Sequence, residues 1–321
     1  MTPDETLVRE VLAEAGWDAD PTIEPWRDRP GTTGRLLVGH ARGTAFVAKI
    51  ADDRAALERS RREATVLSVL GDALVDIAPR LLASRVETDR VIVILERIPG
   101  RPGDAVSGGS GEELDGIVDR LVPVWSLDAT DDRLCGLDLP AWGRGTQRGD
   151  PHRRRRERLA RRIEVTRKRF GDAAADRASL TPLLDRFEHL AERPRPAAPR
   201  LVHGDLHLDN VVFTDRGPRI LDWQKTSLGD PLDDLARLFL EATPNPFLQQ
   251  LLEAAKRLPG PTPSVSEVAA SSLLVWSGFI TGLAGRPDLE PGSRDRRLAD
   301  RLLGPEGPRR LVSEAIEAME A

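Results

Sequence analysis

Cysteine, tyrosine and long apolar runs are scarce or missing in this sequence of 321 residues. Cys135 is the single cysteine, so no intramolecular disulfide can form, which fits a reducing compartment. No run of 18 apolar residues occurs, which argues against a transmembrane helix. The acidic segment 1–5 lacks the apolar core of a secretory signal, so we expect a cytoplasmic location without membrane attachment.

A net positive charge is missing as well. The formal net charge is −5, so the chain as a whole lacks the basic character of a nucleic-acid-binding protein. Hydrophobic residues make up 40% and charged residues 31%, which are ordinary values for a globular protein and exclude wholesale disorder. The length is sufficient for a substantial core and predicts two domains or lobes.

One segment, residues 153–170, is strongly basic, with ten Lys or Arg and two Glu. Its apolar residues recur at helical spacing, which predicts an amphipathic helix with a basic outer face. A nucleic-acid site is one interpretation, but we favour a solvated helix face. Without this segment of net charge +8, the rest of the chain carries −13, a balance that suits a cationic partner.

The segment 201–213 holds the densest set of reactive side chains, because two apolar runs flank two histidines, two aspartates and an asparagine. Another apolar run ends on Asp222, twelve residues after Asn210. Phosphoryl transfer requires such a set: one carboxylate for the attacking hydroxyl, and an amide oxygen plus a second carboxylate for Mg²⁺. A plain hairpin is one alternative. A metal site on His203 and His207 is another, but it needs a helix that Gly204 disfavours.

The His-Gly-Asp-x-x-x-x-Asn string from His203 to Asn210 resembles the catalytic loop of aminoglycoside phosphotransferases and related small-molecule kinases. The resemblance implies that Asp205 accepts or orients the proton of the acceptor hydroxyl, and that Asn210 and Asp222 ligate Mg²⁺. A metal role for Asp222 also suits its place after a buried strand, where an unpaired carboxylate is costly unless a cation offsets its charge. By the same resemblance, His203 and His207 support the loop by hydrogen bonds.

Three short apolar segments, 22–26, 35–40 and 44–50, predict a β-meander near the N-terminus. The turn between the first two contains Gly31 and Gly34, where backbone N–H groups could approach phosphates without a Cβ in the way. Two glycines are also typical of any hairpin, and the string is not a Walker loop. We assign both glycines to the nucleotide-binding site.

Lys49 ends an apolar strand and resembles the nucleotide-binding lysine of kinase-like folds. Glu63 lies 14 residues later on a predicted amphipathic helix, so a strand–turn–helix could bring the two side chains together. Such an ion pair would fix the lysine within reach of the α- and β-phosphates. A solvated lysine at a strand end is the alternative interpretation.

Segments 78–86 and 90–98 predict a second hairpin, in which the nearly continuous apolar run of the latter indicates a strand buried on both faces. This strand ends at a string that resembles the inter-lobe hinge of the same family. The resemblance implies that the Glu96 carbonyl and the Ile98 amide hydrogen-bond the nucleotide base. Residues 99–111, rich in Gly, Pro and Ser, predict a boundary loop.

The remainder of the chain has mainly helical patterns, including residues 179–192 and most of the sequence after 245. The string 229–238 predicts a helix with an acidic first turn, which complements the helix dipole. It also resembles a family segment in which Asp234 braces the catalytic loop.

The predicted fold is therefore α+β and bilobal, with a protein-kinase-like arrangement. Residues 1–97 form an antiparallel-sheet N-lobe that binds nucleotide, and residues 98–321 form a mainly helical C-lobe. The Asp-Phe-Gly and Ala-Pro-Glu strings of protein kinases are missing, which favours a small-molecule acceptor. We expect the acceptor pocket within residues 128–150 and after 240, in a monomer or homodimer.

The resemblance implies transfer of the γ-phosphate of ATP or GTP, with Mg²⁺, to a hydroxyl of a small molecule. Family prevalence and the charge balance favour a cationic antibiotic, either an aminoglycoside or a tuberactinomycin peptide, and hence a resistance function. A metabolic kinase for choline, homoserine or a sugar is the near alternative. A nucleotide-binding pseudokinase and a nucleic-acid-binding protein are the alternatives from other classes. The intact polar set argues against the first of these, and the net acidity argues against the second.

Overall fold

The computed structural model describes residues 1–17, 20–26, 35–104, 109–134, 137, 139, 199–242, 247–265, 267–269, 271–272 and 275. The predictions for Gly31, Gly34 and the helices at 153–170 and 179–192 fall outside these residues. The described α-helices are α1 (Pro3–Glu14), α2 (Arg54–Val69), α3 (Gly111–Trp125), α6 (Pro231–Ala242) and α7 (Phe247–Ala255). Three short 3-10 turns are η1 (Asp132–Leu134), η2 (Leu208–Asn210) and η3 (Trp223–Lys225).

Ten strands are found in the described residues, five of them in one sheet. They are β1 (Thr22–Pro25), β2 (Arg35–Ala41), β3 (Thr44–Ala51), β4 (Leu81–Val86), β5 (Val91–Glu96), β6 (Arg101–Pro102), β7 (Arg200–Val202), β8 (Val211–Thr214), β9 (Gly217–Ile220) and β10 (Ser227–Gly229). The five-stranded sheet has the order β1-β2-β3-β5-β4, and all its neighbouring strands are antiparallel. The predicted meander and second hairpin are both confirmed, and β1, which contains Pro25, lies at an edge of the sheet.

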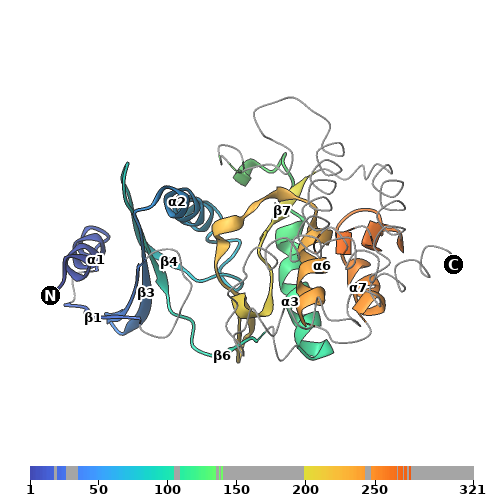
Figure 1. Cartoon of the computed structure of the whole chain (residues 1–321), viewed down its shortest axis with the longest axis horizontal. Coiled ribbons are helices and arrows are strands. Elements are labelled where there is room, and N and C mark those ends of the chain that lie inside the picture. The colour runs from blue at the N-terminus through green and yellow to red at the C-terminus, as the bar shows by residue number, and fades with distance from the viewer. Residues whose placement is uncertain are drawn as a thin grey trace, which may run out of the picture.

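The apolar run in β5 separates into two faces, because successive side chains of a strand point in opposite directions. Val91, Val93 and Leu95 join the apolar cluster that contains α2 and the helices of the second half of the chain. Ile92 and Ile94 join the cluster that contains α1. The sheet therefore lies between α1 and α2 (Figure 1), and the prediction that this strand is buried on both faces is confirmed.

The two ends of the molecule differ in structure along its long axis (Figure 1). The five-stranded sheet occupies the N-terminal end, and α3, α6 and α7 occupy the other end. Two small sheets, β10-β7 and β6-β8-β9, lie between them. This arrangement is the mixed α+β class that was predicted. No helix in the described part of the chain is long and apolar enough to cross a bilayer.

The described part of segment 99–111 contains a short strand that its composition did not indicate. Arg101 and Pro102 form β6, which pairs with Val212 and Phe213 of β8 at the edge of the three-stranded sheet. Proline is tolerated there because an edge strand does not need every N–H for the ladder. In its described residues, β6 ties this segment to β8, the strand that begins within the 201–213 motif.

Candidate functional site

The loop between β7 and η2 contains the motif residues and depends on one glycine. Gly204 has a φ of 77°, a left-handed conformation that favours glycine. A Cβ at this position would lie 2.3 Å from the carbonyl oxygen of Lys225. Both the backbone angle and the close approach of η3 therefore require glycine here.

Asp234, at the start of α6, holds this loop through its backbone. Its Oδ2 accepts the His203 N–H at 2.7 Å and its Oδ1 accepts the Gly204 N–H at 2.9 Å. The indole N–H of Trp125 on α3 also donates to Oδ2, at 3.3 Å. Burial raises the pKa of Asp234 against the lowering effect of nearby His203 and these donors. One buried carboxylate thus joins α3, α6 and the loop.

The two motif histidines both make hydrogen bonds inside the loop region. His203 Nδ1 accepts the Asp205 N–H at 3.3 Å, so its proton is on Nε2, which donates to the Leu221 carbonyl at 2.9 Å. His207 Nε2 lies 3.1 Å from the side-chain nitrogen of Asn210. These contacts are what a supporting role would require.

Strand β8 begins directly after Asn210, and β9 ends two residues before Asp222. Because β8 and β9 pair with each other, Asn210 and Asp222 are neighbours. The Leu221 N–H donates to the Asn210 carbonyl at 2.7 Å, and the Asn210 side-chain N–H donates to the Asp205 carbonyl at 3.0 Å. Asp222 itself is in the left-handed region with a φ of 66°, which Asp tolerates better than most residues.

The side chain of Lys49 on β3 contacts two carboxylates. Its Nζ lies 2.8 Å from Glu63 Oε2 on α2 and 2.8 Å from Asp222 Oδ1. Burial would lower the pKa of Lys49, but the charges of Glu63 and Asp222 outweigh burial and raise it. Asp222 thus already has a cation partner, so its burial does not by itself require a metal.

Helix α2 is also joined directly to η3. Glu63 Oε1 accepts the backbone N–H of Trp223 at 3.2 Å, and Arg62 donates to the Gln224 carbonyl at 3.2 Å. The side-chain amide of Gln224 donates to Asp222 Oδ2 at 2.8 Å. The lysine, the helix and the Asp222 turn therefore form one bonded unit.

Asp205 is almost buried and lies between two cations that the sequence did not single out. Lys225 Nζ lies 2.7 Å from Oδ2, and Arg237 Nη2 lies 2.8 Å from Oδ1. Burial would raise the pKa of Asp205, but the charges of Arg237, Lys225 and His207 lower it to about 2. Arg237 was overlooked because the 229–238 string was interpreted as a helix start and as the segment that supplies Asp234, although a basic residue three positions after Asp234 faces the same side of a helix.

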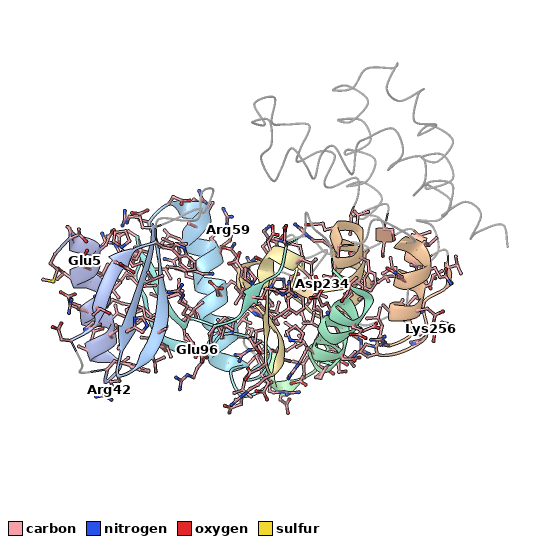
Figure 2. The ribbon with its side chains drawn as sticks, turned by 90° about the horizontal axis from the view of Figure 1, so that it is seen from below. Glu5, Arg42, Arg59, Glu96, Asp234 and Lys256 are labelled. Carbon is pink, nitrogen blue, oxygen red and sulfur yellow. The ribbon has the colours of Figure 1, made fainter. Side chains whose placement is uncertain are left out.

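The predicted hinge residues lie at the end of β5. Glu96 pairs with Phe46 of β3, and its carboxylate accepts the Arg80 N–H at 3.4 Å. Figure 2 shows Glu96 in the first half of the molecule and Asp234 among the helices of the second half. Ile98 follows two residues after the strand end, so both residues lie where the chain leaves the five-stranded sheet.

Magnesium prefers oxygen ligands, and two of the predicted ligands offer them. In the described part of the chain, both side-chain hydrogen bonds of Asn210 involve Nδ2, which leaves Oδ1 available to a cation. Asp222 offers carboxylate oxygens close by. No group of three His, Cys, Asp or Glu side chains suited to a metal occurs among the described residues. The donors fit Mg²⁺ as one amide and one carboxylate.

A sheet with a lysine–glutamate pair, joined to a helical half that holds an Asp-Asn loop and a further Asp, is the arrangement of phosphotransferases of protein-kinase-like fold. The model of the phosphotransferase enzyme family matches residues 30–267 of this chain. The chain belongs to this family, whose members are phosphotransferases and kinases acting on small-molecule hydroxyls.

Curated relatives match over short stretches. Thiamine kinase from Salmonella newport is 36% identical over 72 residues, which is 22% of this chain and 26% of that protein. Acyl-CoA dehydrogenase family member 11 from Rattus norvegicus is 51% identical over 43 residues, which is 12% of this chain and 6% of that protein. The matched part thus spans 26% or less of these two relatives.

Solved structures match over nearly the whole chain. Spectinomycin phosphotransferase in complex with ADP and spectinomycin has a TM-score of 0.64 at 14% identity, covering 98% of both chains. An aminoglycoside 2′-phosphotransferase in complex with GDP has a TM-score of 0.63 at 15% identity, covering 98% of this chain and 96% of that chain. Choline kinase from Streptococcus pneumoniae has a TM-score of 0.55 at 16% identity, covering 99% of both chains. These likenesses show the protein-kinase-like fold.

Proposed function

We propose that this protein transfers the γ-phosphate of ATP or GTP to a hydroxyl of a cationic antibiotic and so confers resistance. The observation that carries the proposal is the meeting of Lys49, Glu63 and Asp222 beside the loop that holds Asp205 and Asn210. A purely structural ion pair would be complete with Lys49 and Glu63. It would not need a second carboxylate, that of Asp222, beside the amide side chain of Asn210. Two relatives of the same fold were solved with ADP and with GDP, which supports either nucleotide as co-substrate.

The nucleotide side of the proposed site comes from the first half of the chain. Lys49 binds the α- and β-phosphates and Glu63 keeps its ammonium in place. Gly31 and Gly34 offer backbone N–H groups to the phosphates, and the Glu96 carbonyl and Ile98 amide receive the base. The corresponding division of the chain is an N-lobe of residues 1–97 and a C-lobe of residues 98–321.

The metal and the acceptor belong to the second half. Asn210 and Asp222 hold Mg²⁺, which neutralises phosphate charge when bound. Asp205 faces the acceptor hydroxyl. With its pKa at about 2, the carboxylate is ionised at neutral pH and is a weak proton acceptor in the ground state. We therefore assign Asp205 to orienting the hydroxyl, with proton transfer late in a loose transition state. His203, His207 and Asp234 keep the loop in place.

The choice of acceptor rests on charge and on the relatives. The chain is acidic, with a net charge of −5, and anionic surroundings favour a cationic ligand. A spectinomycin phosphotransferase of the same fold was solved with spectinomycin bound. We place the protein in the cytoplasm, as a monomer or homodimer, with an acceptor pocket in residues 128–150 and after 240.

A nucleotide-consumption screen tests the proposed function. The purified protein is incubated with Mg-ATP or Mg-GTP and with aminoglycosides, peptide antibiotics and common metabolites, and mass spectrometry detects a gain of one phosphate. We expect the gain on an antibiotic. Phosphorylation of metabolites alone would overturn the resistance function, and nucleotide binding without any transfer would indicate a pseudokinase.

A metabolic kinase is the second candidate, and one observation favours it. Thiamine kinase is 36% identical over 72 residues, and choline kinase shares the fold. Thiamine, choline, homoserine and sugars are therefore included in the same screen. Thiamine and choline both carry a quaternary nitrogen, so a metabolic acceptor would still agree with the charge argument.

A further inference from the structure

The two carboxylate oxygens of Asp205 have different surroundings. Oδ2 contacts Lys225, whose side chain is 43% exposed and lies at the end of η3. Oδ1 contacts Arg237 of α6, whose side chain is 27% exposed. The Arg237 contact is a charge contact without the alignment of a hydrogen bond. Lys225 is therefore the more exposed of the two cations, whereas Arg237 belongs to a packed helix.

Arg237 is held in place by a carboxylate one turn further along α6. Glu241 is fully buried, and its Oε1 lies 3.3 Å from Arg237 Nε. Its Oε2 lies 4.0 Å from His207 Nδ1. A buried glutamate is costly unless polar or charged groups surround it. Glu241 thus connects Arg237 with the histidine that contacts Asn210.

The same helix already fixes the loop backbone. Asp234 at its start accepts the N–H groups of His203 and Gly204, while Arg237 approaches the side chain of Asp205 from the next turn. Helix α6 therefore determines both where the loop lies and how the Asp205 carboxylate is turned. A planar guanidinium suits this task because its nitrogens can contact two carboxylates in a fixed geometry.

We propose that Arg237 is a positioning residue: anchored by Glu241, it fixes Oδ1 of Asp205 and leaves Oδ2 as the oxygen that receives the acceptor hydroxyl. Lys225 contacts Oδ2 and gives way to the hydroxyl, which its exposed stem permits. This inference rests on the proposed role of Asp205. Because an orienting carboxylate acts through its direction, a poorly held Asp205 slows transfer without weakening nucleotide binding.

The experiment compares Arg237→Gln, Arg237→Lys and Glu241→Gln in the full chain. Arg257→Gln is the matched control, since Arg257 also contacts two carboxylates, Asp115 and Asp119, at similar exposure but outside the site. The rate of ADP release from Mg-ATP is measured with water as the acceptor, and also with any acceptor found in the screen. Mg-ADP affinity is measured by calorimetry.

We expect Arg237→Gln to lower kcat by about 10- to 100-fold, because a displacement of a reacting group by about 1 Å can slow a reaction by about 100-fold. Acceptor KM and Mg-ADP affinity should stay within about twofold. Arg237→Lys should restore part of kcat, and Glu241→Gln should have an intermediate kcat. A variant that combines Arg237→Gln with Glu241→Gln should be no slower than Arg237→Gln alone. The Arg257→Gln control should match the wild type.

Unchanged kcat in Arg237→Gln, or a loss confined to nucleotide affinity, would overturn the positioning role. Crystal structures of the wild type and Arg237→Gln with Mg-ADP decide the matter independently of any acceptor. If Asp205 keeps its orientation in the variant, the inference is wrong even if the screen succeeds. If Asp205 turns while the screen finds no acceptor, the positioning role stands and only the proposed function fails.

Discussion

Two neighbouring charge clusters in this protein are built in opposite ways. In the Lys49 cluster, one cation lies between two carboxylates, Glu63 and Asp222. In the Asp205 cluster, one carboxylate lies between two cations, Lys225 and Arg237. Each central group thus keeps its charge, because the flanking charges outweigh burial and raise the pKa of Lys49 while lowering that of Asp205. The arrangement suits a lysine for phosphate and a carboxylate for a hydroxyl.

The clusters also differ in how rigidly their flanking groups are held. Glu63 is buried in the α2 helix and bonded to the Trp223 N–H as well as to Lys49. In the Asp205 cluster only Arg237 is anchored, while Lys225 is exposed. Removing Lys49 should therefore cost much stability in the first cluster, because it leaves two held carboxylates without their cation. In the second cluster the loss of stability should depend on which of the two cations is removed. The following predictions test this contrast.

The largest effects are expected on substitution of Asp205 and Asp222, whose carboxylates have different proposed functions. Asp205→Asn should leave Mg-nucleotide affinity nearly intact and lower kcat by about 10²–10⁴-fold, the usual value of a positioned acid or base. Asp222→Asn should weaken Mg-nucleotide binding and activity together, because it removes the negative charge of a proposed metal ligand. Calorimetry of Mg-ATP binding and kcat measurements distinguish them. Nucleotide binding lost in Asp205→Asn but kept in Asp222→Asn would reverse the assignment.

The next prediction concerns stability. Lys49→Met leaves Glu63, which is 1% exposed, and Asp222 together without their cation, and should lower the free energy of unfolding by about 3 kcal/mol. Lys225→Met leaves Arg237 on Asp205 and should cost under about 1 kcal/mol, because the removed cation is exposed and the carboxylate keeps a second one. Urea denaturation measures both losses.

A double variant checks the cause of the Lys49 effect. Glu63→Gln in the Lys49→Met background removes one of the two uncompensated charges and keeps an oxygen for the Trp223 N–H. Part of the lost stability should return. Equal losses in Lys49→Met and Lys225→Met would mean that the two clusters are not held differently.

The Lys49–Glu63 pair was predictable from the sequence, whereas the Lys49–Asp222 contact and the flanking cations of Asp205 were not. Lys49 and Glu63 are 14 residues apart in a strand–turn–helix, so local structure nearly determines their contact. Arg237 and Asp205 belong to different elements, and their contact depends on how α6 packs against the loop. The burial of Glu241 was also hidden, because glutamate is rarely buried unless it is paired, and the sequence does not show the pairing.

The fold shows the same division between local and long-range information. Apolar patterns predicted the strands of the five-stranded sheet and helix α2, where each pattern follows from local geometry. The two-residue strand β6 was missed, because its pairing with β8 joins residues that are far apart in the sequence. Gly204 is a similar case, since its need for glycine comes partly from the Lys225 carbonyl across the loop.

The smallest expected effect lies outside both clusters, at the start of α3. Ser110 and Glu113 form a capping box, in which each side chain accepts the backbone N–H of the other residue, at 3.2 and 2.9 Å. Glu113→Gln should lower the free energy of unfolding by at most about 1 kcal/mol, as for other helix caps. The kcat value should be unchanged, because α3 contacts Asp234 through Trp125 at the opposite end of the helix.

The pH dependence of this effect has a definite sign. The Ser110 N–H, followed by the charge of Arg101, lowers the pKa of Glu113 below the ordinary value of a glutamate, although burial opposes this. A lowered folded-state pKa means that the carboxylate stabilises the protein above the unfolded-state value and loses that contribution as pH falls through the folded-state value. The stability difference between wild type and Glu113→Gln should therefore be largest near neutral pH and shrink below about pH 4.5. Urea denaturation at several pH values measures it, and a difference that grew on acidification would contradict the cap. A fall in kcat at neutral pH would instead show that the Asp205 cluster depends on the far end of α3, which its anchoring through α6 argues against.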